Sequence, residues 1–407
     1  MISSRFAPSF EPSPWSAHVD ARLLAAHAAG GAPVIDLTVS NVTAPEHKLF
    51  SESLEESLEM ADSDSIYQPH PRGAQRVRAL VADHLAQALG PRPNPNDLWL
   101  TASTSEAYVW LFALLADCGD EILVPEPSYP LFASFAAITG VRLQTYALVY
   151  DDAWMIDLQS LVNSLSDRTR AIVVVSPNNP TGSRLRRWEL DAITALCAQR
   201  AIALIADEVF AEYLLDPAPD AVDTVVGERR CLTFALGGLS KSAGFPQAKL
   251  GWIAMSGPDN EVAAASRALD HIADSLLSVS GAVQRQAPWL MQEGRKRQAL
   301  IDRRIRDNLT TLRSLCDSHP AAVSQPLRCE GGWAAVLRVP AICDDEQWAR
   351  WILDESSVLV QPGHLYDFSA PGHLVLSLLT EPQRWAEGVR KMLGVIAQHI
   401  RQDASRT

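Results

Sequence analysis

Residues 237–252 read GGLSKSAGFPQAKLGW, and two polar segments precede them, SPNNPTG at 176–182 and ADEVF at 206–210. Each of the three segments follows a short apolar run, the pattern of a buried strand. Open α/β sheets bind ligands in the crevice beyond the carboxyl ends of their strands. The three segments therefore predict one pocket at the edge of a buried sheet.

Each predicted strand delivers a different chemical group to that pocket. The strands themselves are predicted over 171–175, 201–206 and 231–236. Pyridoxal phosphate needs an amine that forms a Schiff base, an anion beside its ring nitrogen, and donors around its phosphate and phenolic oxygen. The side chains that match these needs are Lys241, Asp207 and Asn179.

In order and spacing these motifs resemble the fold-type I, class I and II aminotransferases, over nearly the whole chain. The resemblance implies an α/β fold with a mostly parallel, seven-stranded type of sheet covered by helices, and a smaller α+β lobe. It also implies pyridoxal phosphate as the cofactor. We expect an N-terminal arm with part of the small domain at 1–53, the cofactor domain at 54–290, and an interdomain helix with the small domain at 291–407.

Local patterns support this organisation. Apolar strands alternate with amphipathic helices from Leu54 to about Pro288, as in a sheet covered on both faces. A charged helical pattern at 293–315 predicts a long helix, whose basic cluster is interpreted as a solvated face. Further strands are predicted at 34–39, 331–339, 357–363 and 372–379, and helices at 19–29 and 385–400.

Composition excludes several classes of protein. The 407 residues are 47% hydrophobic and 20% charged, which is typical of a soluble globular enzyme. The net charge of -13 is spread along the chain and argues against a nucleic-acid partner. Neither an export signal nor an apolar run as long as a membrane span is present. The six cysteines have no CxxC pair and no histidines at zinc spacing, so we expect reduced thiols, no metal and a cytoplasmic protein.

The cofactor ring has three expected partners from these motifs. Lys241 is expected to hold the cofactor as a Schiff base and then to carry a proton between the substrate and the cofactor. Asp207 is expected to face the ring nitrogen, with a helix cap as the alternative, and Asn179 to donate to the phenolic oxygen. Family members often have a tyrosine where this chain has Phe210, so Asn179 is expected to act there alone.

The phosphate is expected to bind where a strand at 98–100 leads into a helix from about Ser105, because helix starts present unpaired N–H groups. Ser103 and Thr104 are the expected contacts, and Ser240 is a further candidate. Lys249 stands where the family generally has arginine; lysine keeps the charge but loses the bidentate fork. Gly238 stands where many members have serine.

Three further segments receive their roles from the resemblance. Tyr129, in EPSYPLF, is expected to stack on the cofactor ring, with a core tyrosine as the alternative. Tyr67, in YQPHPRG, matches a tyrosine that reaches the phosphate of the neighbouring subunit. The resemblance thereby implies a homodimer with shared active sites. The segment at 34–43 is expected to lie over the cofactor.

The substrate side departs from the family. An arginine that binds the substrate carboxylate is expected within 373–377, but HLVLS places Val375 there. Strand alternation puts His373 and Ser377 on the same side as Val375, so either could face the substrate, although an exposed or capped histidine is the simpler interpretation. Arg72 could supply a cation to the site, with a structural ion pair as the alternative.

The sequence therefore predicts an aminotransferase that moves an amino group between an amino acid or amine and an oxo acid. Because the carboxylate contact that orients the substrate is missing, decarboxylation, elimination or oxidation on the same cofactor stays open. A non-catalytic cofactor-binding module of the kind fused to transcription regulators is a third possibility. The short N-terminal segment is not expected to hold the DNA-binding part of such a protein.

Overall fold

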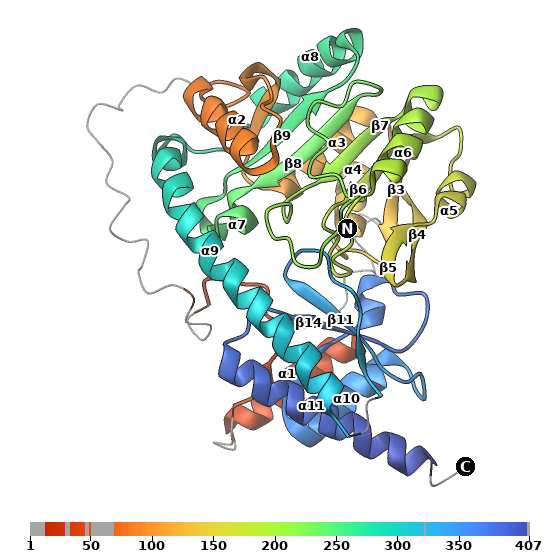
Figure 1. Ribbon diagram of the computed structural model, residues 1–407. Helices are drawn as coiled ribbons and strands as arrows, with labels where there is room; N and C mark the ends of the chain where they lie inside the picture. Colours follow the sequence, from red (N-terminus) through yellow and green to blue (C-terminus); the bar gives the residue numbers. More distant parts are fainter. Residues whose placement is uncertain (1–12, 29–32, 45–48, 50–68, 321–322, 405–407) are drawn as a thin grey trace, which may run out of the picture.

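The computed structural model describes residues 13–28, 33–44, 49, 69–320 and 323–404 (Figure 1). Its longer helices are α1 (Pro14–Ala28), α2 (Gln75–Leu89), α3 (Thr104–Leu115), α4 (Phe132–Thr139), α5 (Leu158–Asn163), α6 (Arg187–Arg200), α8 (Asp259–Leu276), α9 (Gly281–Ser318), α10 (Asp345–Ser356) and α11 (Pro382–Ala404), with a short α7 (Leu239–Ser242). The strands are β1 (Ile35–Asp36), β2 (Leu98–Thr101), β3 (Glu121–Glu126), β4 (Arg142–Asp151), β5 (Ala153–Ile156), β6 (Thr169–Val175), β7 (Ala203–Asp207), β8 (Thr233–Gly238), β9 (Gly251–Ser256), β10 (Gln325–Pro326), β11 (Ala334–Arg338), β12 (Val358–Leu359), β13 (Gln361–Pro362) and β14 (His373–Ser377).

A large mixed sheet forms the centre of the upper part in Figure 1. Its eight strands follow the order β2-β9-β8-β7-β6-β3-β4-β5. Strands β4, β3, β6, β7 and β8 run parallel, β9 is antiparallel to both β8 and β2, and β5 is antiparallel to β4. The mostly parallel sheet is thus confirmed. It has one strand more than the expected seven, because β4 turns back into β5 at the edge.

The central strands are buried on both faces, which explains why they read as continuous apolar runs. Along β6, Ile172 and Val174 belong to the core under α2 and α6, whereas Ala171 and Val173 belong to the core under α3, α4 and α8. This division follows from the two-residue period of a strand. Their carboxyl ends, with the polar segments found in the sequence, therefore meet at one edge of the sheet.

A third core lies in the lower part of the molecule. A four-stranded antiparallel sheet, β10-β11-β14-β13, packs there with α10, α11 and the second half of α9. Trp348, Trp385 and Ile305 are fully buried in this core. Strand β1 pairs in parallel with β12, so the N-terminal segment joins the C-terminal part of the chain.

Several predicted element boundaries differ from the structure, and two of the differences have a clear physical reason. Helix α9 begins at Gly281 rather than at Glu293, because the Ser280 side chain caps it by accepting a hydrogen bond from the N–H of Val283. The single strand predicted at 357–363 is two short strands, β12 and β13, which pair with different partners. Helix α9 is the long diagonal helix that runs from the upper part to the lower part in Figure 1.

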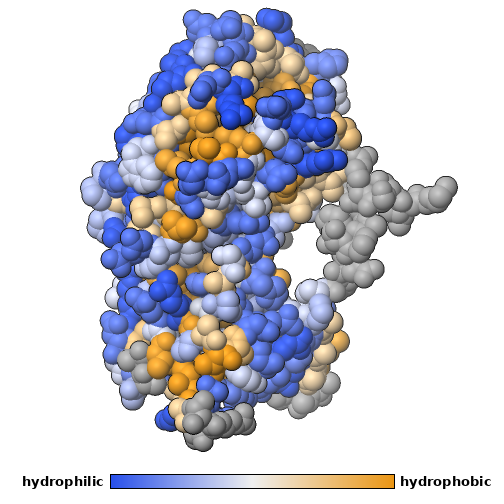
Figure 2. All heavy atoms as spheres, turned by 90° about the vertical axis from the view of Figure 1, so that its right-hand side faces the viewer, coloured by the Kyte–Doolittle hydropathy of each residue, from blue (hydrophilic) through white to orange (hydrophobic). Residues whose placement is uncertain are grey.

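Figure 2 shows one face of the molecule, on which hydrophilic residues surround apolar areas in both the upper and the lower part. In the described part of the chain, no helix combines the length and the apolar character that crossing a membrane requires. The candidate site lies between the upper part, built on the large sheet, and the lower part, which helix α9 joins to it.

Candidate active site

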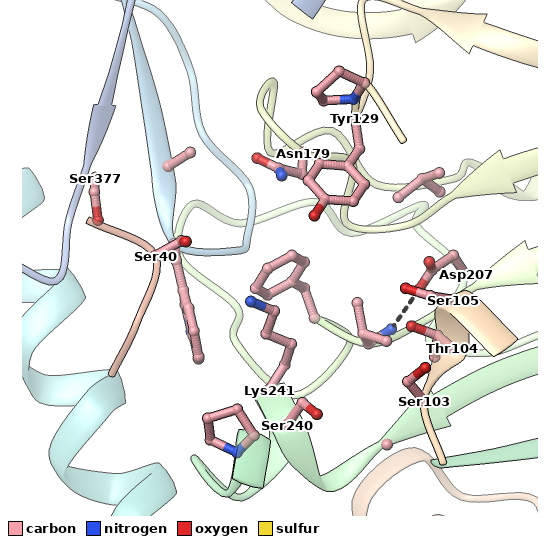
Figure 3. A pocket seen from close by; sticks show the side chains of 18 of the residues that line it. Ser40, Ser103, Thr104, Ser105, Tyr129, Asn179, Asp207, Ser240, Lys241 and Ser377 are labelled. Carbon is pink, nitrogen blue, oxygen red and sulfur yellow. Dashed lines mark hydrogen bonds between the residues drawn. The ribbon is translucent and has the colours of Figure 1, made fainter. Parts of the chain in front are cut away.

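A cavity of about 570 Å³ lies between the large sheet and the strands of the lower part (Figure 3). Strands β6, β7 and β8 end at this cavity, as the sequence predicts. Eight of the nine predicted site residues line it: Ser103, Thr104, Tyr129, Asn179, Asp207, Ser240, Lys241 and Lys249. The ninth, Tyr67, lies outside the described residues.

Lys241 stands on α7, directly after β8, and its side chain points into the cavity (Figure 3). Its Nζ lies 4.9 Å from the ring centre of Trp333 and 5.7 Å from that of Phe210. Among the described residues Nζ has neither a hydrogen bond nor an ion pair. Burial lowers the pKa of Lys241, and the charge of Asp207 partly opposes that change. The result is an amine held among aromatic rings that loses its proton more easily than an exposed lysine does.

Asp207 ends β7 and is 9% exposed. Its Oδ1 accepts a hydrogen bond of 3.1 Å from the N–H of Val209, and its Oδ2 accepts one of 3.0 Å from the hydroxyl of Tyr108. Burial raises the pKa of Asp207 to about 6, although both hydrogen bonds and Lys241 act in the opposite direction. Asp207 caps no described helix, so the alternative of a helix cap is wrong.

The turn from β2 into α3 contributes Ser103, Thr104 and Ser105 to the cavity. Ser103 caps α3, because its Oγ accepts the N–H of Glu106 at 3.1 Å. The N–H of Ala102 donates to Glu106 Oε2 at 2.7 Å and is thereby occupied. The start of α3 thus presents small polar side chains and backbone N–H groups to the cavity, beginning at Ser103 rather than at Ala102.

Close backbone packing surrounds this turn. A Cβ on Gly238 would lie 3.1 Å from Gly251 Cα and 3.2 Å from the carbonyl oxygen of Leu250. A Cβ on Gly251 would lie 3.0 Å from the hydroxyl of Thr101. A serine at position 238 would therefore crowd backbone atoms, which explains why glycine stands there. Lys249 is exposed at the rim of the cavity.

The two asparagines of SPNNPTG have different functions. Asn178 is buried and holds the turn, because its Nδ2 donates to the carbonyl of Pro127 at 3.1 Å and to the hydroxyl of Thr181 at 2.9 Å. Asn179 lines the cavity, and its side chain lies near Tyr129 on the far side of the space from Lys241 (Figure 3). Tyr129 is 44% exposed, so the alternative of a core tyrosine is wrong.

Two glycines let the Asn179 turn pack against the segment that carries Trp333. A Cβ on Gly182, whose φ is +69°, would lie 2.6 Å from Cys329 Sγ, and one on Gly331 would lie 2.6 Å from the carbonyl oxygen of Tyr213. Glu330, in the same segment, is 1% exposed and accepts the N–H of Arg184 at 3.1 Å.

The side chains of Glu330 and Arg186 form a buried ion pair across this contact. The hydroxyl of Tyr213 donates to the carbonyl of Lys241 at 2.8 Å, and the Tyr213 ring packs edge-on against Trp333. Buried polar contacts thus join the two parts of the molecule directly behind the cavity.

The wall opposite the large sheet is mostly apolar. Val375 is 2% exposed and lines the cavity, with Ser377 nearby. Of the basic side chains that the structure describes, Lys241 and Lys249 line the cavity. The segment predicted to lie over the cofactor contributes Thr38, Val39 and Ser40, and the hydroxyl of Ser377 donates to the carbonyl of Val39.

Neither His373 nor Arg72 lines the cavity. The His373 ring stacks on Phe368 at 4.6 Å, and its Nδ1 lies 3.0 Å from the carbonyl oxygen of Ala370. It stands at the start of β14, beyond the part of the strand that borders the cavity. The interpretation of Arg72 as a structural residue is confirmed, since it forms an ion pair of 2.6 Å with Asp270.

Trp333 and Tyr108 are among the cavity residues that sequence reasoning missed. Trp333 follows two glycines in GGW and enters the cavity only because β11 packs beneath the large sheet. Tyr108 stands four residues after Thr104 on α3, which places it on the same helix face. That spacing was a signal available in the sequence, but its target, Asp207, lies 99 residues away.

Comparison with known proteins identifies the family. The sequence model of the family described as aminotransferase class I and II matches residues 32–387. Nicotianamine aminotransferase A of Hordeum vulgare is 33% identical over 187 residues, which are 46% of this chain and 40% of that protein. The chain thus aligns with less than half of the length of that relative.

Longer matches show the same relationship. The alanine aminotransferase of Mycobacterium bovis is 26% identical over 323 residues, covering 77% of this chain and 74% of that protein. The solved alanine aminotransferase from Pyrococcus furiosus has the same fold, with a TM-score of 0.83, 21% identity, and coverage of 98% of this chain and 100% of the other. This chain belongs to the class I and II aminotransferases, a family of transferases that use pyridoxal phosphate.

Proposed function

We propose that this chain is an aminotransferase that binds pyridoxal phosphate through Lys241 and transfers an amino group from an amino acid or amine to an oxo acid. One observation carries the proposal. The Lys241 amine stands in the cavity without a hydrogen bond or ion pair to any described residue, and the buried Asp207 carboxylate lines the same cavity.

The residues present fit this cofactor. Lys241 offers an amine with a lowered pKa, as a nucleophilic lysine requires. Asp207 is a buried carboxylate that forms no ion pair with any residue the structure describes, and it would pair with a cationic ring nitrogen. The start of α3 and the exposed Lys249 supply backbone donors and a positive charge for a phosphate. Asn179 would donate to the phenolic oxygen of the ring.

When bound, pyridoxal phosphate serves as an electron sink for the bond that breaks at the substrate carbon bearing the amine. Asp207 would keep the ring nitrogen protonated through its charge. Lys241 Nζ would bind the cofactor, leave it when the substrate amine arrives, and then move a proton as general base and acid. Tyr129 and Trp333 would exclude water from this space, since both present aromatic rings to the cavity.

The test begins with the absorbance spectrum of the protein purified with added cofactor. We expect a band from lysine-bound pyridoxal phosphate, and borohydride reduction followed by peptide mass spectrometry should place the label on Lys241. Lys241→Ala should lose both signals, whereas Lys391→Ala, at an exposed lysine on α11, should keep them. A wild-type protein with no cofactor band, or a label on another lysine, would refute the proposal.

The reaction type is tested with amino donors. Alanine is a suitable first donor, because the mycobacterial relative is an alanine aminotransferase. Accumulation of pyridoxamine phosphate with an oxo acid supports transamination. Release of carbon dioxide, or of hydrogen peroxide from dioxygen, would instead indicate a decarboxylase or an oxidase, the alternatives that Val375 leaves open because it supplies no charge to orient a carboxylate.

We further propose that the active protein is a cytoplasmic homodimer and that Tyr67 reaches the phosphate of the partner subunit. The resemblance of YQPHPRG to the family motif supports the shared site, and the cysteine pattern supports a reducing compartment. Mixing Lys241→Ala with Tyr67→Phe, each of which we expect to lack activity alone, tests the shared site by subunit exchange. Recovery of about a quarter of wild-type activity would support it, and no recovery would contradict it.

A further inference from the structure

The hydroxyl of Tyr108 donates to Asp207 Oδ2 at 3.0 Å inside the protein. Tyr108 is 3% exposed and stands on α3, whereas Asp207 ends β7. Nothing in the sequence motifs gives Tyr108 a part in the site. Its contact is nevertheless with the one carboxylate that the proposed cofactor needs.

The direction of this hydrogen bond follows from the chemistry of the two groups. Burial, and next the negative charge of Asp207, raise the pKa of Tyr108 well above its usual value, so the phenol keeps its proton and donates it. A carboxylate can only accept. The N–H of Val209 donates to the other oxygen, Oδ1, at 3.1 Å. The two donors together fix the plane of the carboxylate group.

Aromatic packing holds Tyr108 in place. Its ring stacks on Phe135 with centres 5.3 Å apart and planes at 14°, and it meets Phe132 and Phe112 edge-on at 5.3 and 6.0 Å. A side chain enclosed in this way has no other rotamer available without opening the core beneath α3 and α4. The position of the phenolic oxygen is therefore set by the fold before any ligand binds.

We propose that Tyr108 is a positioning residue for the reaction, whose hydroxyl orients the Asp207 carboxylate toward the cofactor ring and keeps it ionised. This inference rests on the proposed function, since it concerns the carboxylate that would pair with the ring nitrogen. A donated hydrogen bond stabilises the charged form of a carboxylate, and burial works against that form. Tyr108 offsets part of the cost of burying Asp207.

Other groups near Asp207 act on its protonation in either direction. Lys241 on α7 favours the ionised form, and the N–H of Val209 does the same. Glu208, the next residue along the chain, carries a like charge when ionised, and Tyr129 faces Asp207 from the loop after β3. Glu208 is held away by hydrogen bonds of 2.7 Å from Thr224 and Val225. Only Tyr108 and Val209 donate hydrogen bonds to the Asp207 carboxylate from the described residues.

The test removes this hydroxyl and compares it with another buried one. Tyr108→Phe keeps the ring and its packing. Tyr146→Phe is the matched control, because Tyr146 is 1% exposed and its hydroxyl donates at 2.8 Å to the carbonyl of Val173 in the same sheet. The measurements are the affinity for pyridoxal phosphate, by equilibrium dialysis against the full-length protein across pH, and the pH profile of kcat/KM.

In Tyr108→Phe we expect the acidic limb of both profiles to move to higher pH by about 1 unit, the size of one hydrogen bond to a charged group. Tyr146→Phe should leave both limbs in place. Replacement of Tyr108 by 3-fluorotyrosine keeps the shape but makes the phenol a stronger donor, so the limbs should move to lower pH. The fluorinated protein tests the inference even where Tyr108→Phe fails to fold.

The outcomes separate this inference from the proposed function. A wild-type protein that binds no pyridoxal phosphate at any pH refutes the proposed function. A wild-type protein that binds it, with acidic limbs unchanged in both Tyr108 variants, refutes the role of Tyr108 alone. Equal shifts in Tyr108→Phe and Tyr146→Phe would also refute it, because the effect would then arise from the general loss of a buried hydroxyl.

Discussion

Asp207→Asn removes a buried charge that the fold must accommodate before the cofactor binds. Burial raises the pKa of Asp207 from its ordinary value of 3.8 to about 6 in the folded chain. This difference makes the ionised carboxyl unfavourable for the cofactor-free fold by about 3 kcal/mol. Because Asp207 is 9% exposed, solvent screens little of this cost.

The sign of the pH dependence follows from the direction of the pKa change. The folded state holds the Asp207 proton more tightly than the unfolded chain does. The contribution of this protonation to the unfolding free energy is therefore fully present below pH 3.8 and is lost as pH rises through about 6. Between pH 5 and pH 8 the cofactor-free wild type should lose about 1.4 kcal/mol of unfolding free energy from this residue. Asp207→Asn should not show that loss.

Urea unfolding of the cofactor-free proteins at pH 5 and pH 8 measures this difference. From pH 5 to pH 8 the unfolding free energy of Asp207→Asn should rise by about 1.4 kcal/mol relative to that of wild type. The affinity of Asp207→Asn for pyridoxal phosphate should be lower than that of wild type. Asp151→Asn, at an exposed aspartate on β4, is the control and should show neither change. A relative stability of Asp207→Asn that is independent of pH would refute the reasoning.

Two further predictions concern the contacts around the cavity. Glu330→Gln should lower the unfolding free energy by about 1 to 3 kcal/mol in chemical denaturation, because the buried guanidinium of Arg186 then keeps only the more exposed Asp220 as an ion-pair partner; an unchanged or increased unfolding free energy would contradict this. Val375→Arg should lower KM for amino acid donors at least tenfold by supplying a cation to the apolar wall, with Val375→Leu as the uncharged control. Equal KM values in both Val375 variants would mean that the substrate carboxylate does not approach that wall.

The sequence was most informative where local chemistry repeats along the chain. The apolar runs before Asn179, Asp207 and Lys241 predicted three neighbouring strands, and β6, β7 and β8 lie side by side in that order. Buried parallel strands need continuous apolar residues, so their ends are visible in the sequence as sharp changes to polar residues. The same reasoning gave the turn before α3.

Local patterns left open those side-chain positions that depend on distant parts of the chain. Strand alternation allowed His373 to face the substrate, and only the structure shows that it stacks on Phe368 outside the cavity, in line with the simpler interpretation. The sequence singled out Asn179 in its motif, and only the structure shows that burial makes the neighbouring Asn178 a structural residue. The long helix α9 was placed too late because its capping residue, Ser280, lies among residues without a clear periodic pattern.

The sequence by itself determined the fold class, the family and eight of the residues that line the cavity, because strand patterns and turn chemistry are local properties. Only the tertiary structure decided what surrounds them. It brought Trp333 over Lys241, placed the hydroxyl of Tyr108 on Asp207, and left Val375 on an apolar wall. These contacts join residues that are far apart in the chain, and they depend on how helices and strands pack in three dimensions, which no local pattern encodes.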